Sequence, residues 1–126
     1  MVSMVNIEGY RDFLDFMQSI DPDDKPVYVY FSGSKNDDGE SWCPDCVVAE
    51  PVVKGFVSEL KQPLIFVYVD VGDRDYWKDK RCPFREDTLT KLMVIPTLIK
   101  LKGVKRLEGS QCANKDLLHL MFDEDD

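Results

Sequence analysis

Two cysteines, Cys43 and Cys46, are the residues whose type and spacing point most clearly to chemistry. They lie in the segment SWCPDC, with Pro44 and Asp45 between them and a tryptophan directly before the first. Such a pair can contribute to a metal site, form a structural disulfide, remain as two buried thiols, or exchange electrons with other disulfides. The rest of the chain helps to decide between these four chemistries.

A metal site requires more ligands than this pair supplies. Tetrahedral zinc sites usually contain a second close pair of cysteines or histidines, whereas Cys82, Cys112 and His119 are scattered along the chain. A structural disulfide is disfavoured inside cells, where thiol buffers keep cysteines reduced. The sequence therefore predicts no bound metal, and it leaves either dithiol chemistry or two inert buried thiols.

The elements expected around the pair favour dithiol chemistry. The apolar run 27–31 predicts a strand buried on both faces, the polar segment 32–41 predicts a loop, and the apolar spacing over 43–61 predicts a helix. Cys43 then lies at the helix N-terminus, where unpaired backbone N–H groups and the helix dipole stabilise a thiolate. Cys46 follows one turn later on the same face, at a spacing that permits a disulfide with Cys43.

The remaining hydrophobic pattern predicts a single α/β domain over residues 1–126. Further strands are predicted at 2–7, 64–70, 97–101 and 104–109, and further helices from 7 to the turn-rich segment 21–26, within 73–93 and over 114–122. Pro51 should kink the helix that follows Cys43. The order of the elements, with a hairpin at Lys102-Gly103, predicts a central mixed β-sheet with helices on both faces.

Composition and local hydrophobicity argue against several kinds of partner. The net charge of −8 disfavours binding to nucleic acid and to anionic membranes. The first residues lack the basic and apolar regions of a secretory signal, and the longest apolar runs are too short to span a bilayer. These two observations predict a soluble protein inside the cell, and the hydrophobic fraction of 44% predicts that it folds rather than stays disordered. We expect it to be a monomer in the cytoplasm.

Five short segments resemble those of a known family. They are FSGSK (31–35), SWCPDC (41–46), AEPVV (49–53), YWKD (76–79) and IPTL (95–98). Through these segments the chain resembles thioredoxins, and within them the thioredoxin domain-containing protein 17 family, also called the fourteen-kilodalton thioredoxin-related proteins. The resemblance covers nearly the whole chain, and several of the segments are specific to this branch.

The resemblance implies a thioredoxin fold and a cytosolic disulfide reductase. It implies that Cys43 is the nucleophile, that Cys46 is the resolving thiol, and that a redox-active disulfide joins them after turnover. It implies no bound cofactor, since electrons come from NADPH through thioredoxin reductase. It also implies a narrower substrate range than that of thioredoxin: cystine-like small disulfides and selected protein disulfides, such as those of dynein light chain. The competing interpretation is a redox-sensing protein-binding module without substantial turnover.

The resemblance also assigns roles to residues that shape the site. In a thioredoxin-like fold, Pro96 follows a cis peptide bond and faces the dithiol, which leaves the backbone of Ile95 free to pair with an extended substrate. The alternative is an ordinary turn proline. Trp42 is expected to shield the dithiol and to offer a contact surface for partners, unless it only packs. Tyr76 and Trp77 match the family segment, but packing alone explains them equally well.

The Pro44-Asp45 pair distinguishes this motif from that of ordinary thioredoxins, which carry glycine and proline between the cysteines. The charge of Asp45 favours the helix N-terminus but opposes a neighbouring thiolate, so the sequence leaves its net effect on the pKa of Cys43 open. Together with the acidic residues of the preceding loop, Asp37, Asp38 and Glu40, it predicts weak reactivity toward acidic disulfide partners.

Two positions leave questions about proton and thiol chemistry. Tyr30 stands where thioredoxin has a buried aspartate that handles the proton of the second cysteine. A tyrosine with a pKa of about 10 is a poor base at neutral pH, so water, Asp45, Glu50 or no dedicated base remains. Cys82 follows two basic residues and is expected at the surface, either inert or sensitive to oxidation.

Overall fold

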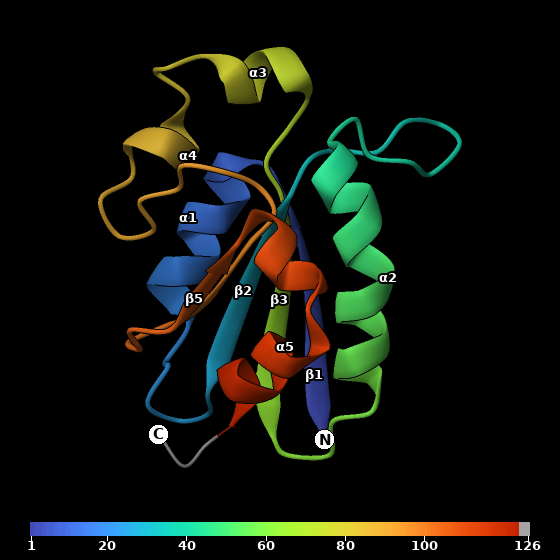
Figure 1. The fold of residues 1–126 in the computed structure, drawn as a ribbon. Helices are drawn as coiled ribbons and strands as arrows, with labels where there is room; N and C mark the ends of the chain where they lie inside the picture. The colour runs from blue at the N-terminus through green and yellow to red at the C-terminus, as the bar shows by residue number, and fades with distance from the viewer. Residues whose placement is uncertain (124–126) are drawn as a thin grey trace.

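Five strands form one mixed sheet at the centre of the computed structural model, which describes residues 1–123 (Figure 1). In chain order they are β1 (Val2–Glu8), β2 (Val27–Ser32), β3 (Leu64–Asp70), β4 (Thr97–Lys100) and β5 (Arg106–Glu108). Their order across the sheet is β1-β3-β2-β4-β5, with β1, β3 and β2 parallel and with β4 antiparallel to both of its neighbours. The prediction of a central mixed sheet is confirmed.

Helices cover both faces of this sheet, as the sequence predicts (Figure 1). One face is packed by α1 (Tyr10–Ser19) and by the short helices α3 (Arg74–Lys78) and α4 (Pro83–Glu86). The other is packed by α2 (Pro44–Ser58), α5 (Lys115–Phe122) and the 3₁₀ helix η1 (Gly109–Ala113). No helix within residues 1–123 is long and apolar enough to cross a membrane.

Strand β2 lies between β3 and β4, and all six of its residues are buried. Its side chains alternate between the two faces, because successive residues of a strand point in opposite directions. Val27, Val29 and Phe31 pack on the side of α1, whereas Tyr28 and Tyr30 pack on the side of α2 and α5. Removing a side chain such as Phe31 from water contributes about 1.5–3 kcal/mol to folding. Apolar side chains therefore stabilise the fold on both faces of β2, which explains its continuous apolar sequence.

Helix α2 begins at Pro44, which fits the first helical position because the backbone N–H that proline lacks would have no helical partner there. The helix continues past Pro51 and ends at Ser58, short of the predicted end at Lys61. Its buried residues recur along one stripe: Cys46, Ala49, Val53 and Val57. This stripe fixes which side of α2 faces the sheet, and it therefore fixes the direction of Cys46.

The predictions from the sequence are least accurate for the segments that follow β3 and β4. The single short helix predicted within 73–93 is two helices, of which α3 is capped by Asp73 and α4 is opened by Pro83. The strand predicted at 104–109 is shorter, because Gly109 turns the chain into η1 at a φ of +59°. Strands β4 and β5 do form the predicted hairpin.

Candidate active site

The loop between β2 and α2 is tied to the segment that follows β3. The Ser34 N–H donates to the Gly72 carbonyl oxygen at 3.0 Å, and the indole Nε1–H of Trp42 donates to the same oxygen at 2.9 Å. Gly33 makes room for this indole, since a Cβ atom at residue 33 would lie 2.9 Å from the Trp42 ring. The ends of two central strands thereby hold Trp42 beside the start of α2.

Cys43 is the N-cap residue of α2, at the helix terminus where the sequence places it. Its backbone N–H donates to Ser41 Oγ at 3.2 Å, and its Sγ accepts a hydrogen bond from the Cys46 backbone N–H at 3.3 Å. The sulfur thus takes the place of the oxygen of an ordinary capping side chain. Cys43 is 5% exposed and Cys46 is 1% exposed, and both are thiols in this structure. Cys43 therefore lies at the opening of the site, and Cys46 lies behind it.

The two thiols ionise differently because they are hydrogen-bonded to each other. The hydrogen bond from the Cys46 thiol lowers the pKa of Cys43 from its ordinary 9.0 to about 7, against the effect of burial. The backbone N–H groups of Cys46 and Asp45 lower this pKa further, and the charge of Asp45 raises it. The same thiol–thiol hydrogen bond, followed by burial, raises the pKa of Cys46 well above its ordinary value. Cys43 is therefore the thiol that ionises near neutral pH.

No carboxylate within residues 1–123 forms a hydrogen bond with Cys46. The hydrogen bond to Cys43 and burial raise the pKa of Cys46 by more than the Ser32 hydroxyl and the Gly33 N–H lower it. Tyr30 is buried, and its hydroxyl has no hydrogen-bond partner among the described residues. Burial, followed by the two nearby thiols, raises the pKa of Tyr30 far above its ordinary value. Tyr30 is therefore not a base near neutral pH, as the sequence predicts.

Glu50, one of the proton acceptors that the sequence left open, is engaged by other partners. Its Oε1 accepts a hydrogen bond from the Tyr68 hydroxyl at 2.7 Å, and its Oε2 accepts one from Lys35 Nζ at 2.5 Å. Burial raises the pKa of Glu50, but the hydrogen bonds from Lys35 and Tyr68 and the charge of Lys54 outweigh burial and hold the pKa below its ordinary value. Glu50 is therefore a weak base, and it joins α2 to β3 and to the preceding loop.

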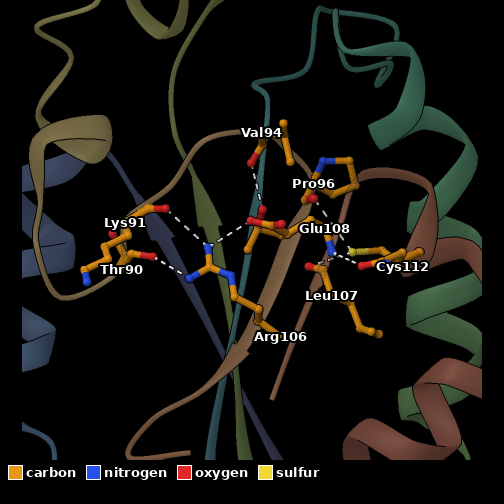
Figure 2. Close-up of polar contacts among 10 residues, drawn as sticks. Thr90, Lys91, Val94, Pro96, Arg106, Leu107, Glu108 and Cys112 are labelled. Carbon is orange, nitrogen blue, oxygen red and sulfur yellow. Dashed lines mark hydrogen bonds and ion pairs between the residues drawn. The ribbon is translucent and has the colours of Figure 1, made fainter. Parts of the chain in front are cut away.

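The peptide bond between Ile95 and Pro96 faces the dithiol from the segment before β4. This bond is cis, as the resemblance implies. The Cys43 thiol donates to the Ile95 carbonyl oxygen across 3.6 Å. Behind the proline, the Cys112 thiol donates to the Pro96 carbonyl oxygen at 3.8 Å (Figure 2), and the Gly109 N–H donates to the same oxygen at 2.7 Å. The cis peptide is thus held between the dithiol in front and η1 behind.

Arg106 of β5 holds the chain that leads to this cis peptide (Figure 2). Its Nη1 donates to the Thr90 carbonyl oxygen at 3.0 Å, and its Nη2 donates to the Lys91 carbonyl oxygen at 3.4 Å. Its Nη2 also lies 3.3 Å from Glu108 Oε2. Sequence reasoning missed Arg106, because its partners are backbone groups of a distant segment that leave no trace in the spacing of residue types.

A groove of about 400 Å³ opens at Cys43, between the start of α2, the helices α3 and α4, and the segment before β4. Of the seven residues that the sequence assigns to the site, five line it: Trp42, Cys43, Pro44, Asp45 and Ile95. The other two, Cys46 and Pro96, do not line the groove, and both are buried. The fold thus brings together two segments of the sequence on which the predicted site rests.

The opposite side of the groove consists of residues that sequence reasoning missed, apart from Trp77, whose role it left open between function and packing. They are Trp77, Lys78, Arg85, Met93 and Val94. Trp77 and Lys78 belong to the YWKD segment of the family resemblance, which is the one signal in the sequence that pointed to this wall. The other three lie in a region without a clear periodic pattern, so only the folded chain reveals that they face Cys43.

The remaining thiols and the histidine do not line this groove. Cys82 is 2% exposed and packs in the same cluster as Trp77, so the prediction of a surface thiol is wrong: the chain turns inward at Cys82 to begin α4. Cys112 is buried, which raises its pKa to about 12. His119 packs edge-on against Phe56. In the part of the chain that the structure describes, no three His, Cys, Asp or Glu side chains are grouped as a metal site.

The fold and the dithiol at the helix N-terminus define a thioredoxin-fold domain. The crystal structure of a reduced Schistosoma mansoni thioredoxin pre-protein has the same fold: it matches with a TM-score of 0.56 and 20% sequence identity over 95% of this chain and 99% of that chain. The family model of the thioredoxin domain-containing protein 17-like thioredoxin domain matches residues 6–124, so the chain belongs to this family.

Two relatives show how far this similarity extends. Thioredoxin domain-containing protein 17 of Epinephelus coioides is 42% identical over 121 residues, which cover 96% of this chain and 95% of the relative. The protein of the same name from Homo sapiens is 36% identical over the same length and the same shares of both chains. The similarity therefore extends over nearly the whole length of both chains.

Proposed function

We propose that the protein is a disulfide reductase that works through Cys43 and Cys46. The observation that carries this proposal is the Cys43 thiol, whose pKa of about 7 is set by the thiol behind it and which lines an open groove. The thiolate is the attacking form in thiol–disulfide exchange, and attack is most efficient when the pKa of the thiol lies near the ambient pH. Membership of the family supports the same activity.

The reaction proceeds in two exchanges. The Cys43 thiolate attacks one sulfur of the substrate, so that a mixed disulfide forms and the other substrate sulfur leaves as a thiolate. Cys46 then loses its proton and attacks the Cys43 sulfur, which forms the 43–46 disulfide and expels the second substrate thiolate. Two electrons pass from the protein to the substrate. Since no carboxylate among the described residues is hydrogen-bonded to Cys46, its proton passes to the departing thiolate or to water.

We further propose that thioredoxin reductase restores the dithiol with electrons from NADPH, and that the chain works as a cytosolic monomer without a bound cofactor. The proposed substrates are cystine-like small disulfides and selected protein disulfides, such as those of dynein light chain. These assignments rest on the family resemblance. The groove beside Cys43, with residues of α3 and α4 on one side, supports a narrower choice of substrate than a flat surface would allow.

A second candidate function is a redox-sensing module that binds a protein partner. Met93 is 73% exposed and Val94 is 42% exposed, and both lie beside the dithiol. Exposed apolar side chains next to one another are typical of a contact surface for another protein. On this alternative the dithiol would report the redox state without turning over, so a variant without Cys43 would retain binding and its cellular effect.

The oxidation of NADPH in a coupled assay tests the proposal. The oxidised protein is mixed with thioredoxin reductase and NADPH, and cystine or insulin is added in parallel. We expect NADPH consumption with cystine and little with insulin. C43S should abolish turnover, and C46S should accumulate the mixed disulfide, because its resolving thiol is missing. Consumption with both substrates would instead indicate the broad range of an ordinary thioredoxin, and consumption with neither would contradict coupling to this reductase.

A further inference from the structure

The groove beside Cys43 carries opposite charges on its two walls. Asp45 lines the wall formed by α2, whereas Lys78 of α3 and Arg85 of α4 line the wall opposite. The chain as a whole has a net charge of −8, so two cations on one wall of the dithiol groove run against the general charge of the molecule. The wall formed by α3 and α4 is therefore positively charged, although the protein as a whole is acidic.

Arg85 is held in place by its neighbour Trp77. Its Nε donates to the Trp77 carbonyl oxygen at 2.6 Å, and its guanidinium carbon lies 4.1 Å from the centre of the Trp77 ring. The terminal nitrogens of Arg85 have no hydrogen-bond partner within residues 1–123. The guanidinium is therefore fixed at its base and free at its tip, which is the state in which it can bind a ligand with little loss of side-chain entropy.

The acidic residues that the sequence counted against anionic substrates do not all belong to this groove. Asp45 lines it, but Asp37, Asp38 and Glu40 of the preceding loop do not. The guanidinium of Arg85 presents two parallel N–H donors, which match the two oxygens of a carboxylate. The apolar groups beside the sulfur suit the short hydrocarbon chain that separates a carboxylate from a disulfide. The local groups therefore favour an anionic substrate more than the overall charge does.

We infer that Arg85, assisted by Lys78, binds a carboxylate of the disulfide that Cys43 attacks. The cystine-like disulfides of the proposed function carry such a carboxylate a few bonds from the attacked sulfur, and their ammonium group would face Asp45. This inference rests on the proposed reductase function and names the groups that select its substrate. It replaces the expectation of weak reactivity toward acidic partners, which treated the acidic loop as part of the site.

A series of small disulfides with nearly the same skeleton tests the inference. The probes are 3,3′-dithiodipropionate with two carboxylates, bis(2-hydroxyethyl) disulfide without charge, and cystamine with two ammonium groups. Pre-reduced protein is mixed with each in single turnover, and oxidation of the protein dithiol is followed by acid quench and mass spectrometry. No reductase is needed, so coupling to thioredoxin reductase does not enter the result.

The wild-type protein is expected to react about ten-fold faster with the dicarboxylate than with the neutral disulfide, as one charge-assisted pair allows. In R85Q this ratio should fall to near one, and in R85K it should take an intermediate value. The matched control is R81Q, which removes a nearby exposed cation that does not line the groove and should retain the wild-type ratio.

Three outcomes would count against these assignments. A wild-type ratio near one, with the neutral disulfide still reduced, would overturn the inference and leave the reductase proposal standing. Equal slowing of all three probes in R85Q would also overturn it, because Arg85 would then only shape the groove. Failure of the wild-type protein to reduce any probe would overturn the reductase proposal, and the inference with it.

Discussion

At the scale of single residues, the chemistry depends on one hydrogen bond between two sulfur atoms. The Cys46 thiol is the main cause of the low pKa of Cys43. The charge of Asp45, whose net effect the sequence leaves open, acts in the opposite direction. The backbone N–H groups at the helix terminus assist but do not dominate. The tuning of this dithiol therefore comes first from the second cysteine and only then from the helix.

Alkylation kinetics of the reduced protein measure this tuning. The rate of reaction of Cys43 with iodoacetamide should rise with pH to half of its maximum near pH 7, because only the thiolate reacts. C46A should move this midpoint upward, toward the ordinary pKa of cysteine, and C46S should move it less, because serine retains a hydroxyl donor. D45N should move it downward, since the Asp45 charge raises the pKa of Cys43. A midpoint unchanged in C46A would contradict the assigned role of the thiol–thiol hydrogen bond.

The sequence identifies some site residues and not others for a clear reason. Cys43, Cys46 and Pro96 belong to short segments with unusual residue types, so they can be recognised from the sequence around them. Arg85 and Arg106 contact backbone groups and an aromatic ring that are supplied by other elements, and nothing in their immediate sequence reveals this. Sequence motifs therefore reveal residues whose own side chains are reactive or conformationally special. They do not reveal residues whose role depends on contacts with distant parts of the chain.

At the scale of elements, the segment before β4 depends on a clamp from β5. Arg106 binds two successive carbonyl groups of this segment and one carboxylate of its own strand. These contacts lie behind the groove rather than in it. The position of Met93 and Val94 beside Cys43 therefore depends on a side chain that never meets the substrate.

Replacement of Arg106 tests this dependence. R106Q should lower the free energy of unfolding by about 1–3 kcal/mol, because the partly buried Thr90 carbonyl group and the exposed Lys91 carbonyl group lose a charged donor. It should also accelerate amide hydrogen exchange in residues 89–94 more than elsewhere. R106K, which retains the charge but not the two-pronged geometry, should give smaller changes in both measurements. Exchange that rises evenly over the chain in R106Q would contradict a local clamp.

The elements themselves were predictable in proportion to their length and regularity. Strands β2 and β3 have continuous apolar sequences, and the structure places them within one residue of the predicted bounds. The helices α3, α4 and η1 have at most five residues each, too few for a periodic pattern to register. They form because caps and tertiary contacts stabilise them, and these contacts exist only in the folded chain.

At the scale of the whole molecule, the strand order brings the site together. Placing β2 between β3 and β4 puts the start of α2 next to the cis peptide before β4, although Cys43 and Ile95 are 52 positions apart in the sequence. The alternation of elements predicts a mixed sheet but does not by itself give this order, because several orders satisfy the same hydrophobic pattern. The family resemblance supplied the thioredoxin fold that the pattern alone left undetermined.

The central strand β2 also contains a destabilising polar group, which a single substitution should remove. The Tyr30 hydroxyl is buried without a hydrogen-bond partner among residues 1–123, and such a group destabilises a fold by about 1–3 kcal/mol. Y30F should therefore raise the free energy of unfolding in urea by about 1–2 kcal/mol and leave the disulfide reductase rate unchanged. Y30A, which leaves a cavity instead, should lower stability by about 3–5 kcal/mol. Loss of activity in a stable Y30F protein would show that this hydroxyl takes part in the reaction.

The unequal ionisation of Cys43 and Cys46 also determines how the midpoint potential of the dithiol depends on pH. Below about pH 7 the reduced protein holds two protons on sulfur, and above it holds only the proton of Cys46. Reduction of the disulfide thus takes up two protons below about pH 7 and one proton above it. As the pH rises, the midpoint potential therefore falls by about 59 mV per pH unit below this break in slope and by about 30 mV per pH unit above it. Because this break lies near neutrality, a modest acidification of the surroundings weakens the dithiol as an electron donor more steeply than an equal alkaline shift strengthens it.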